Sequence, residues 1–233
     1  MTISIGMLAF PNITQLDLTG PYEVFSRLRE KRLELIWKNT NPILSDTGFV
    51  ITPTCDYASS PKFDVIVVPG GPGQQVLMRD AETLEFLRMQ AETAKWVMSV
   101  CTGSLVLGAA GLISRKRVSC HWLSLPLVEI LGGVPVEERV VFDGQLLTTA
   151  GVSAGIDGAL ALVEQLEGRQ SAEFIQLAIE YDPQPLFNAG SPRTAPEDMI
   201  KSVREMAAPM LKAREQGARA AAEKLGIVGE RVG

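Results

Sequence analysis

The stretch KWVMSVCTGSLVLGAAGL, residues 95–112, decides how the chain folds. Residues 95–100 are a mostly apolar run of the kind found in strands that are buried on both faces. Residues 103–112 can form a helix, so Cys101 lies on a tight turn between a strand and a helix. Ligand crevices of doubly wound sheets lie at the carboxyl ends of the strands. We therefore expect Cys101 at the edge of a sheet where a ligand binds.

The same alternation continues on both sides of this stretch. Further strands are expected at residues 3–10, 33–37, 63–68, 117–120, 139–142 and 145–149, and further helices at 82–92, 123–131, 157–167 and 172–181. Another helix is expected to open at Thr19-Gly20-Pro21, with Thr19 as its cap. Asp143-Gly144 is a hairpin signal. The sequence thus predicts an α/β fold, a flavodoxin-like sandwich with a mainly parallel sheet flanked by helices.

Residues 1–233 are expected to form a single domain, because no shift in composition marks a boundary. Within it we distinguish a core at 1–180, a Pro-, Asn-, Gly- and Ser-rich loop at 181–196, and a C-terminal helical extension at 197–233. The buried face of that extension is expected from helical spacing at Ile200, Val203, Met206 and Met210.

The composition favours small-molecule chemistry. The net charge of -5 argues against a nucleic acid or an anionic membrane as partner, because both require a basic surface. The N-terminus lacks the features of a signal peptide and no apolar run is long enough to span a membrane, so a cytoplasmic location is expected. The cysteines Cys55, Cys101 and Cys120 form no CxxC pair, which predicts neither a disulfide nor a zinc site.

The setting of Cys101 favours a reactive thiol. Backbone N–H groups at the start of a helix stabilise a thiolate and lower its pKa below the free value of ~8.5. The alternative is a small buried hydrophobic residue, the usual role of a free cysteine. Cys55 and Cys120 have no comparable setting and are interpreted as structural.

A reactive thiol needs a proton partner, and two residues are candidates. His121 is the only histidine, but nothing in the sequence directs it toward Cys101, and a packed or surface histidine is the simpler interpretation. Asp17 follows the first predicted strand, in a loop expected at the same edge of the sheet. Its alternative role is that of a local turn or helix-start aspartate.

Two glycine-rich turns are expected at this edge, at residues 69–73 and 150–155. Their N–H groups can stabilise developing negative charge, although both can also be simple tight turns. A dinucleotide site at Gly71-x-Gly73 is poorly supported, because Val76 stands where the third glycine belongs.

Five motifs stand out together: Asp17-Leu18-Thr19-Gly20-Pro21, Val67-Val68-Pro69-Gly70-Gly71, Val100-Cys101-Thr102-Gly103, Ala109 with Gly111-Leu112, and Cys120-His121-Trp122. They resemble the ThiJ/PfpI superfamily of class I glutamine amidotransferase-like folds, from the N-terminus to about residue 165. Peptidases and deglycases of this superfamily tend to have His after the cysteine and Glu in the first loop. Thr102, Asp17 and the turn from Gly151 to Asp157 instead resemble its isonitrile hydratases.

This resemblance implies hydration of isonitriles (isocyanides) to N-substituted formamides, without metal or organic cofactor, by an enzyme that is usually a homodimer. It implies that Cys101 is the nucleophile, Asp17 the general acid and base, and Thr102 an orienting residue. Backbone from Gly70, Gly71, Gly151 and Val152 would complete the substrate pocket. Ala150 stands where a further glycine is expected, and its methyl group could restrict the motion of the turn.

Two other functions remain open. One is a ligand-sensing module of the type fused to AraC-type regulators, which share the Cys-Thr-Gly and His-Trp features. The other is a redox or stress-response protein in which Cys101 is oxidised to the sulfinate. The basic DNA-binding region that follows such sensor modules has no counterpart in the charge-balanced tail.

Overall fold

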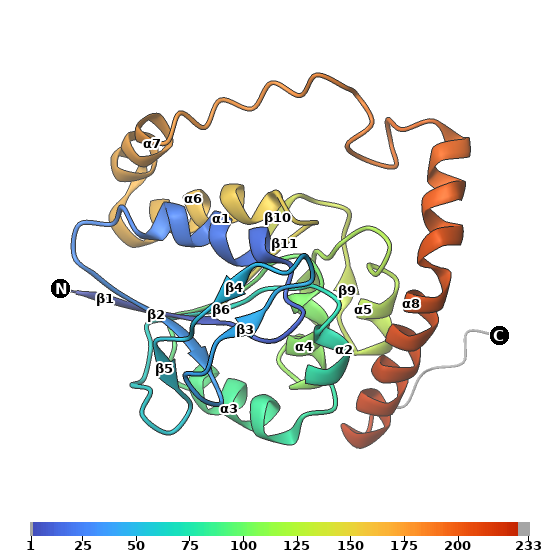
Figure 1. The fold of residues 1–233 in the computed structure, drawn as a ribbon, viewed down its shortest axis with the longest axis horizontal. Coiled ribbons are helices and arrows are strands. Elements are labelled where there is room, and N and C mark those ends of the chain that lie inside the picture. Colours follow the sequence, from blue (N-terminus) through green and yellow to red (C-terminus); the bar gives the residue numbers. More distant parts are fainter. Residues whose placement is uncertain (1, 228–233) are drawn as a thin grey trace.

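A computed structural model describes residues 2–227. Its centre is a seven-stranded sheet in the order β10-β11-β7-β6-β1-β2-β5 (Figure 1). These strands are β1 (Ile3–Leu8), β2 (Lys31–Trp37), β5 (Cys55–Asp56), β6 (Val65–Val68), β7 (Trp96–Ser99), β10 (Val140–Asp143) and β11 (Leu146–Thr149). Only β10 runs antiparallel to its neighbour, as the Asp143-Gly144 hairpin requires.

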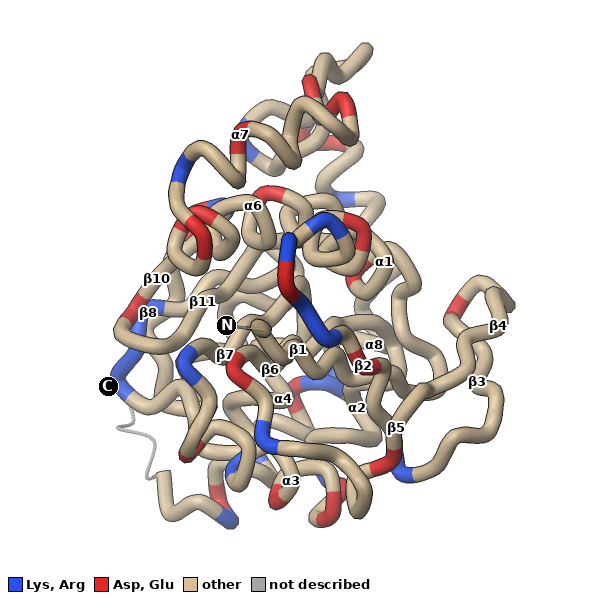
Figure 2. The backbone as a smooth tube through the Cα atoms, turned by 90° about the vertical axis from the view of Figure 1, so that its left-hand side faces the viewer, with Lys and Arg blue, Asp and Glu red and all other residues tan. Residues whose placement is uncertain are grey.

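Helices cover both faces of this sheet (Figures 1 and 2). They are α1 (Gln15–Phe25), α2 (Gln74–Leu77), α3 (Ala81–Ala91), α4 (Gly103–Ala109), α5 (Leu127–Ile130), α6 (Ala154–Glu167), α7 (Arg169–Ala178) and α8 (Glu197–Lys224). On one face α1 packs against α6, which also contacts α7, while α3 and α4 lie on the other. The predicted α/β sandwich with a mainly parallel sheet and a C-terminal helix is therefore confirmed.

Two short pairs lie outside the main sheet. They are β3 (Ile43–Leu44) with β4 (Val50–Ile51), and β8 (Arg117–Val118) with β9 (Val134–Pro135). The strand expected at 117–120 is thus only two residues long. Just beyond it, the Ser119 N–H donates to the hydroxyl of Thr148 on β11 at 2.8 Å.

The first helix begins earlier than expected. It starts at Gln15 after an extended Thr14, so Thr19 is no cap, Pro21 lies inside the helix, and Asp17 belongs to its first turn. A proline inside a helix removes one N–H donor. The helix nevertheless continues to Phe25 and packs closely against α6 next to Pro21. A Cβ atom on Gly20 would lie 3.1 Å from the Ile156 side chain.

The buried face of α8 agrees with the prediction only in part, since Ile200, Val203 and Met210 are half-buried but Met206 is not. Met206 is 78% exposed, while the second half of the helix is buried through Arg214 and a set of small residues, Gly217, Ala218, Ala221 and Ala222. Small residues let the helix approach closely, since a Cβ atom on Gly217 would lie 2.6 Å from the Met78 methyl group. Residues 228–233 of the predicted extension lie outside the described residues.

Candidate active site

Cys101 occupies a strained turn between β7 and α4. Its φ angle of 56° is left-handed, a conformation that a non-glycine residue keeps only when its surroundings enforce it. The Cys101 N–H donates to the Ala150 carbonyl at 3.0 Å, and the Val100 N–H donates to the Val68 carbonyl at 3.0 Å. The turn is thus fixed from the ends of both neighbouring strands, and it presents the thiol at their carboxyl edge.

Asp17 reaches this edge from the first turn of α1. Its side chain is fully buried, and Oδ2 accepts the Gly70 N–H at 2.9 Å. Oδ1 accepts no hydrogen bond of regular geometry within residues 2–227, while the Cys101 thiol lies within interaction range of the carboxyl group. The carboxyl group thus faces the reactive turn across the sheet edge rather than capping its own helix.

Burial dominates the proton affinity of this carboxyl group. It raises the pKa of Asp17 from 3.8 to about 7, against the lowering effect of the hydrogen bonds from Gly70 and Cys101. The negative charge of Asp46 adds to the rise. Asp17 can therefore both accept and release a proton near neutral pH, as a general acid and base must.

Backbone N–H groups at the helix start lower the pKa of the Cys101 thiol, as predicted, but burial raises it by more. Burial, followed by the charge of Asp17, raises the pKa of the Cys101 thiol well above its usual value. The N–H groups of Val152 and Thr102 act in the opposite direction by hydrogen bonding to the sulfur. The expectation of a lowered pKa is therefore wrong, because the side chain is only 6% exposed. The thiol thus holds its proton at neutral pH, and the Asp17 carboxyl group lies beside it.

The turn at 69–73 holds Asp17 and Thr102 in place. The Gly71 N–H donates to Thr102 Oγ1 at 3.1 Å, as the Gly70 N–H does to Asp17. A Cβ atom on Gly70 would lie 2.6 Å from Thr102 Oγ1 and 2.9 Å from Asp17 Oδ2. Only glycine admits so close an approach. Both predicted substrate-binding amides are therefore already bonded to site residues.

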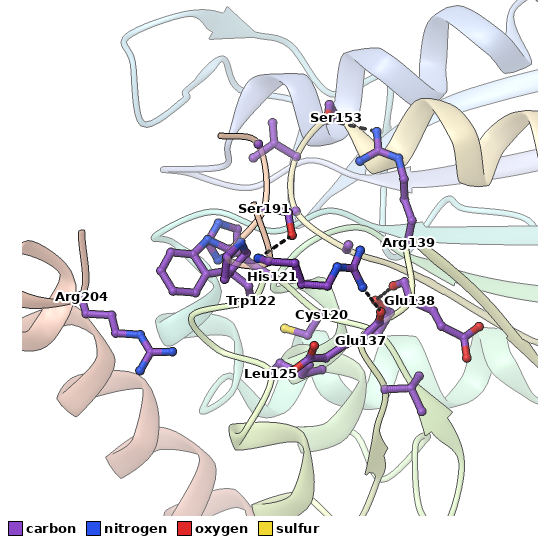
Figure 3. A pocket seen from close by; sticks show the side chains of 18 residues that line it. Cys120, His121, Trp122, Leu125, Glu137, Glu138, Arg139, Ser153, Ser191 and Arg204 are labelled. Atoms are coloured by element: carbon purple, nitrogen blue, oxygen red, sulfur yellow. Dashed lines mark hydrogen bonds between the residues drawn. The ribbon is translucent and has the colours of Figure 1, made fainter. Parts of the chain in front are cut away.

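The second predicted turn lines a pocket of about 400 Å³ (Figure 3). Ala150, Gly151 and Val152 contribute to one wall. The other lining residues are Ser119, Cys120, His121, Trp122, Leu125, Val136, Glu137, Glu138, Arg139, Ser153, Gly190, Ser191, Pro192, Arg193 and Arg204. Cys101 does not line this pocket; it lies against the turn through the Val152 N–H.

His121 lines this pocket with an uncharged imidazole ring. Burial, with the charge of Arg214, lowers the pKa of His121 to about 4. Nδ1 accepts the Leu123 N–H at 3.3 Å, and a Cβ atom on Gly151 would lie 2.7 Å from the ring. These contacts agree with a packed histidine rather than with a base for Cys101.

Sequence reasoning missed three buried polar side chains, Gln74, Ser99 and Arg214. Arg214 was counted with the solvated charges of the tail. Its spacing of three, four and seven residues from Gly217, Ala218 and Ala221 was an available signal, because those positions share one helix face. No group of three or more potential metal-ligating side chains occurs in the described part of the chain.

Comparison with known proteins places these features in a family. The model of the DJ-1/PfpI family matches residues 3–165. An isonitrile hydratase of Pseudomonas putida is 48% identical over 227 residues, which cover 97% of this chain and all of that protein. A transcriptional regulator of the helix-turn-helix type from Pseudomonas aeruginosa is 29% identical over 188 residues, covering 77% of this chain and 51% of the regulator.

A solved structure agrees closely with the fold. The crystal structure of a ThiJ/PfpI family protein from Pseudomonas syringae superposes with a TM-score of 0.92 at 39% identity. The match covers 94% of this chain and 91% of that one, so it includes α8 as well as the sheet and its flanking helices.

Proposed function

The chain belongs to the DJ-1/PfpI family, and on that premise we propose that it is an enzyme that hydrates isonitriles to N-substituted formamides. The main support is the pairing of one buried thiol with one buried carboxyl group, Cys101 with Asp17. The identity of 48% to an isonitrile hydratase along its whole length adds to this support.

The first step forms a bond between Cys101 and the substrate. The Asp17 carboxylate takes the thiol proton as the sulfur attacks the terminal isonitrile carbon, which accepts soft nucleophiles. Asp17 then gives that proton to the same carbon, and a thioimidate results. A carboxyl group whose pKa is about 7 suits both transfers.

The second step adds water. Asp17, again ionised, takes a proton from a water molecule that attacks the thioimidate carbon. That proton passes to the substrate nitrogen. The C–S bond then breaks as the hydroxyl of the adduct becomes the formamide carbonyl, and the hydroxyl proton passes through Asp17 to the departing sulfur, which regenerates the Cys101 thiol. The N–H groups of Val152 and Thr102 stabilise the sulfur anion when it departs.

Thr102 and the glycine turns position these groups. The Thr102 hydroxyl accepts the Gly71 N–H, so its own O–H group is free to orient the substrate or the attacking water by a hydrogen bond while Asp17 transfers the protons. Gly70 fixes the Asp17 carboxylate by its N–H group. We assign the pocket lined by Gly151 and Val152 to the N-substituent of the substrate, since the Val152 N–H is hydrogen-bonded to the Cys101 sulfur.

We also propose a cytoplasmic homodimer. Apolar side chains are exposed on α7 and on the loop that follows it, at Phe174, Leu177, Leu186 and Phe187. A second copy of the chain can cover such a surface. No helix within residues 2–227 combines the length and apolar character that crossing a membrane requires.

The sensor function is less well supported than hydration. The regulator aligns with this chain over only about half of its own length, whereas the isonitrile hydratase aligns over its entire length. The redox function requires a thiol that ionises readily, and burial raises the pKa of Cys101.

The direct test is formamide production from a simple alkyl isonitrile, followed by chromatography. The native chain should produce the formamide at rates far above the uncatalysed reaction, and Cys101→Ala should reduce production to background. Cys101→Ala that retains native activity would refute the proposal, as would a folded native chain that turns over no isonitrile.

A further inference from the structure

Arg214 is a buried cation to which residues 2–227 offer no carboxylate partner. It is 5% exposed, and its Nη1 donates to the Ser124 hydroxyl at 3.0 Å. No Asp or Glu among residues 2–227 forms an ion pair with it, and its Nε has no hydrogen-bond acceptor among them. Burying a charge is costly unless an opposite charge compensates it. Burial of the Arg214 charge therefore lowers the stability of the folded chain, and a negative charge nearby would offset this loss.

The helix that provides Arg214 packs firmly at this position. The second half of α8 contacts α2, α4 and α5. Gly217 lies one turn further on, where a Cβ atom would meet the Met78 methyl group at 2.6 Å. Arg214 therefore cannot reach solvent without moving the helix.

Arg214 shares a buried polar layer with the reactive turn. Ser124, which it binds, donates its own N–H to the His121 carbonyl at 2.8 Å. Cys120 precedes His121 and interacts with Ser104, whose hydroxyl donates to the Cys101 carbonyl at 3.3 Å. This layer thus links α8 to the turn that carries the nucleophile.

The charges around this layer agree with such a link. Arg214 lowers the pKa of the Cys120 thiol and of His121, and the thiolate form of Cys101 raises the pKa of Arg214. Asp17 faces Cys101 from α1 on the other side, with a negative charge that disfavours the thiolate. The attraction between the Arg214 guanidinium and the Cys101 thiolate acts in the opposite direction and favours the ionised thiol.

We propose that Arg214 is a positioning residue whose buried charge stabilises the Cys101 thiolate while Asp17 holds the thiol proton. The guanidinium does not touch the substrate, and it gains or loses no proton in the cycle. The effect of Arg214 on turnover rests on the proposed isonitrile hydration. The effect of Arg214 on the pKa of the Cys101 thiol does not.

The experiment measures the reactivity of Cys101 directly. Iodoacetamide alkylation of the Cys101 peptide is followed by mass spectrometry between pH 7 and 10 in the native chain, Arg214→Met, Arg214→Gln and Arg214→Lys. Loss of the charge should raise the thiol pKa by about one unit, which slows alkylation about tenfold at each pH below it. Arg214→Lys should stay within about threefold of native, because it retains the charge.

Arg219→Met is the matched control, because Arg219 lies on the same helix and is exposed, and its one ion-pair partner among residues 2–227 is Glu215 at the surface. It should alkylate at the native rate. Replacing a buried charge by an apolar side chain is often tolerated, and urea unfolding identifies which of the Met and Gln variants remain native. The folded ones are then compared.

The outcomes separate this inference from the proposed function. Slower alkylation together with a tenfold lower kcat and an unchanged KM supports both. Slower alkylation in a chain that turns over no isonitrile supports the role of Arg214 alone. Native alkylation rates in folded Arg214→Met or Arg214→Gln overturn it, whatever happens to turnover.

Discussion

Two buried thiols follow two strands of this chain, and their surroundings differ. Cys101, after β7, has a left-handed backbone, a buried carboxyl neighbour and N–H groups directed at its sulfur. Cys120, after β8, has a serine and a cation nearby, and burial raises its pKa to about 11. Burial is common to both, so it cannot by itself make a thiol catalytic. The buried carboxyl neighbour and the left-handed turn distinguish Cys101, since the Cys120 sulfur also accepts a backbone N–H group, that of His121.

The largest effect is expected when the proposed proton acceptor of Cys101, Asp17, is replaced. Asp17→Asn keeps an oxygen for the Gly70 N–H but can neither take the thiol proton nor deliver one. We expect a loss of about 10³-fold in kcat, within the usual range for a general acid and base. Steady-state formamide assays measure it. If kcat of Asp17→Asn stayed within tenfold of native, Asp17 would not be the group that makes Cys101 reactive.

The same substitution should stabilise the fold. The pKa of Asp17 rises from 3.8 in the unfolded chain to about 7 in the folded one, so its contribution to stability is present below pH 4 and lost as the pH rises through 7. At pH 8 the buried carboxylate costs up to about 4 kcal/mol. Urea unfolding at pH 8 should show Asp17→Asn gaining part of this. The gain should vanish near pH 4, and a variant less stable than native at pH 8 contradicts the assignment.

The pH profile of the native chain gives the next test. Only the ionised Asp17 can accept the thiol proton, so kcat/KM should fall about tenfold per pH unit below the Asp17 pKa of about 7. Asp46→Asn should move this limb to slightly lower pH, because the charge of Asp46 raises the Asp17 pKa. A flat profile between pH 5 and 8 would remove Asp17 from the rate-determining chemistry.

The smallest effect is expected at the other thiol. Cys120→Ala leaves Asp17, Thr102 and the glycine turn untouched, so kcat should change less than about threefold, whereas KM can change because Cys120 lines the proposed substrate pocket. The assay is formamide production, with urea unfolding as the control for folding. A loss as large as that of Asp17→Asn would show that the two thiols act together.

The sequence predicted the site better than the helices around it. Cys101, Asp17, Thr102 and the 69–73 turn could be placed at one edge because parallel strands end on the same side of their sheet. The start of α1 was missed because Pro21 was interpreted as a helix opening. Local patterns place a residue on an element, but the bounds of an element depend on packing.

Two further differences have the same origin. The pKa of Cys101 was predicted from the helix start alone, whereas burial is decided by the complete fold. Arg214 was invisible because a charged residue in a polar helix is normally solvated, and only the docking of Gly217 and its small neighbours buries it. The pKa of Cys101 and the burial of the Arg214 charge therefore depend on tertiary packing, which local sequence patterns do not predict.

The central claim is that Cys101 forms the covalent intermediate. Mixing the chain with excess alkyl isonitrile, quenching in acid and mapping the peptides by mass spectrometry tests it directly. We predict a mass increase equal to one isonitrile on the Cys101 peptide during turnover, absent from the Cys120 peptide. Formamide production without any adduct on Cys101, or with the adduct on Cys120, would contradict the account.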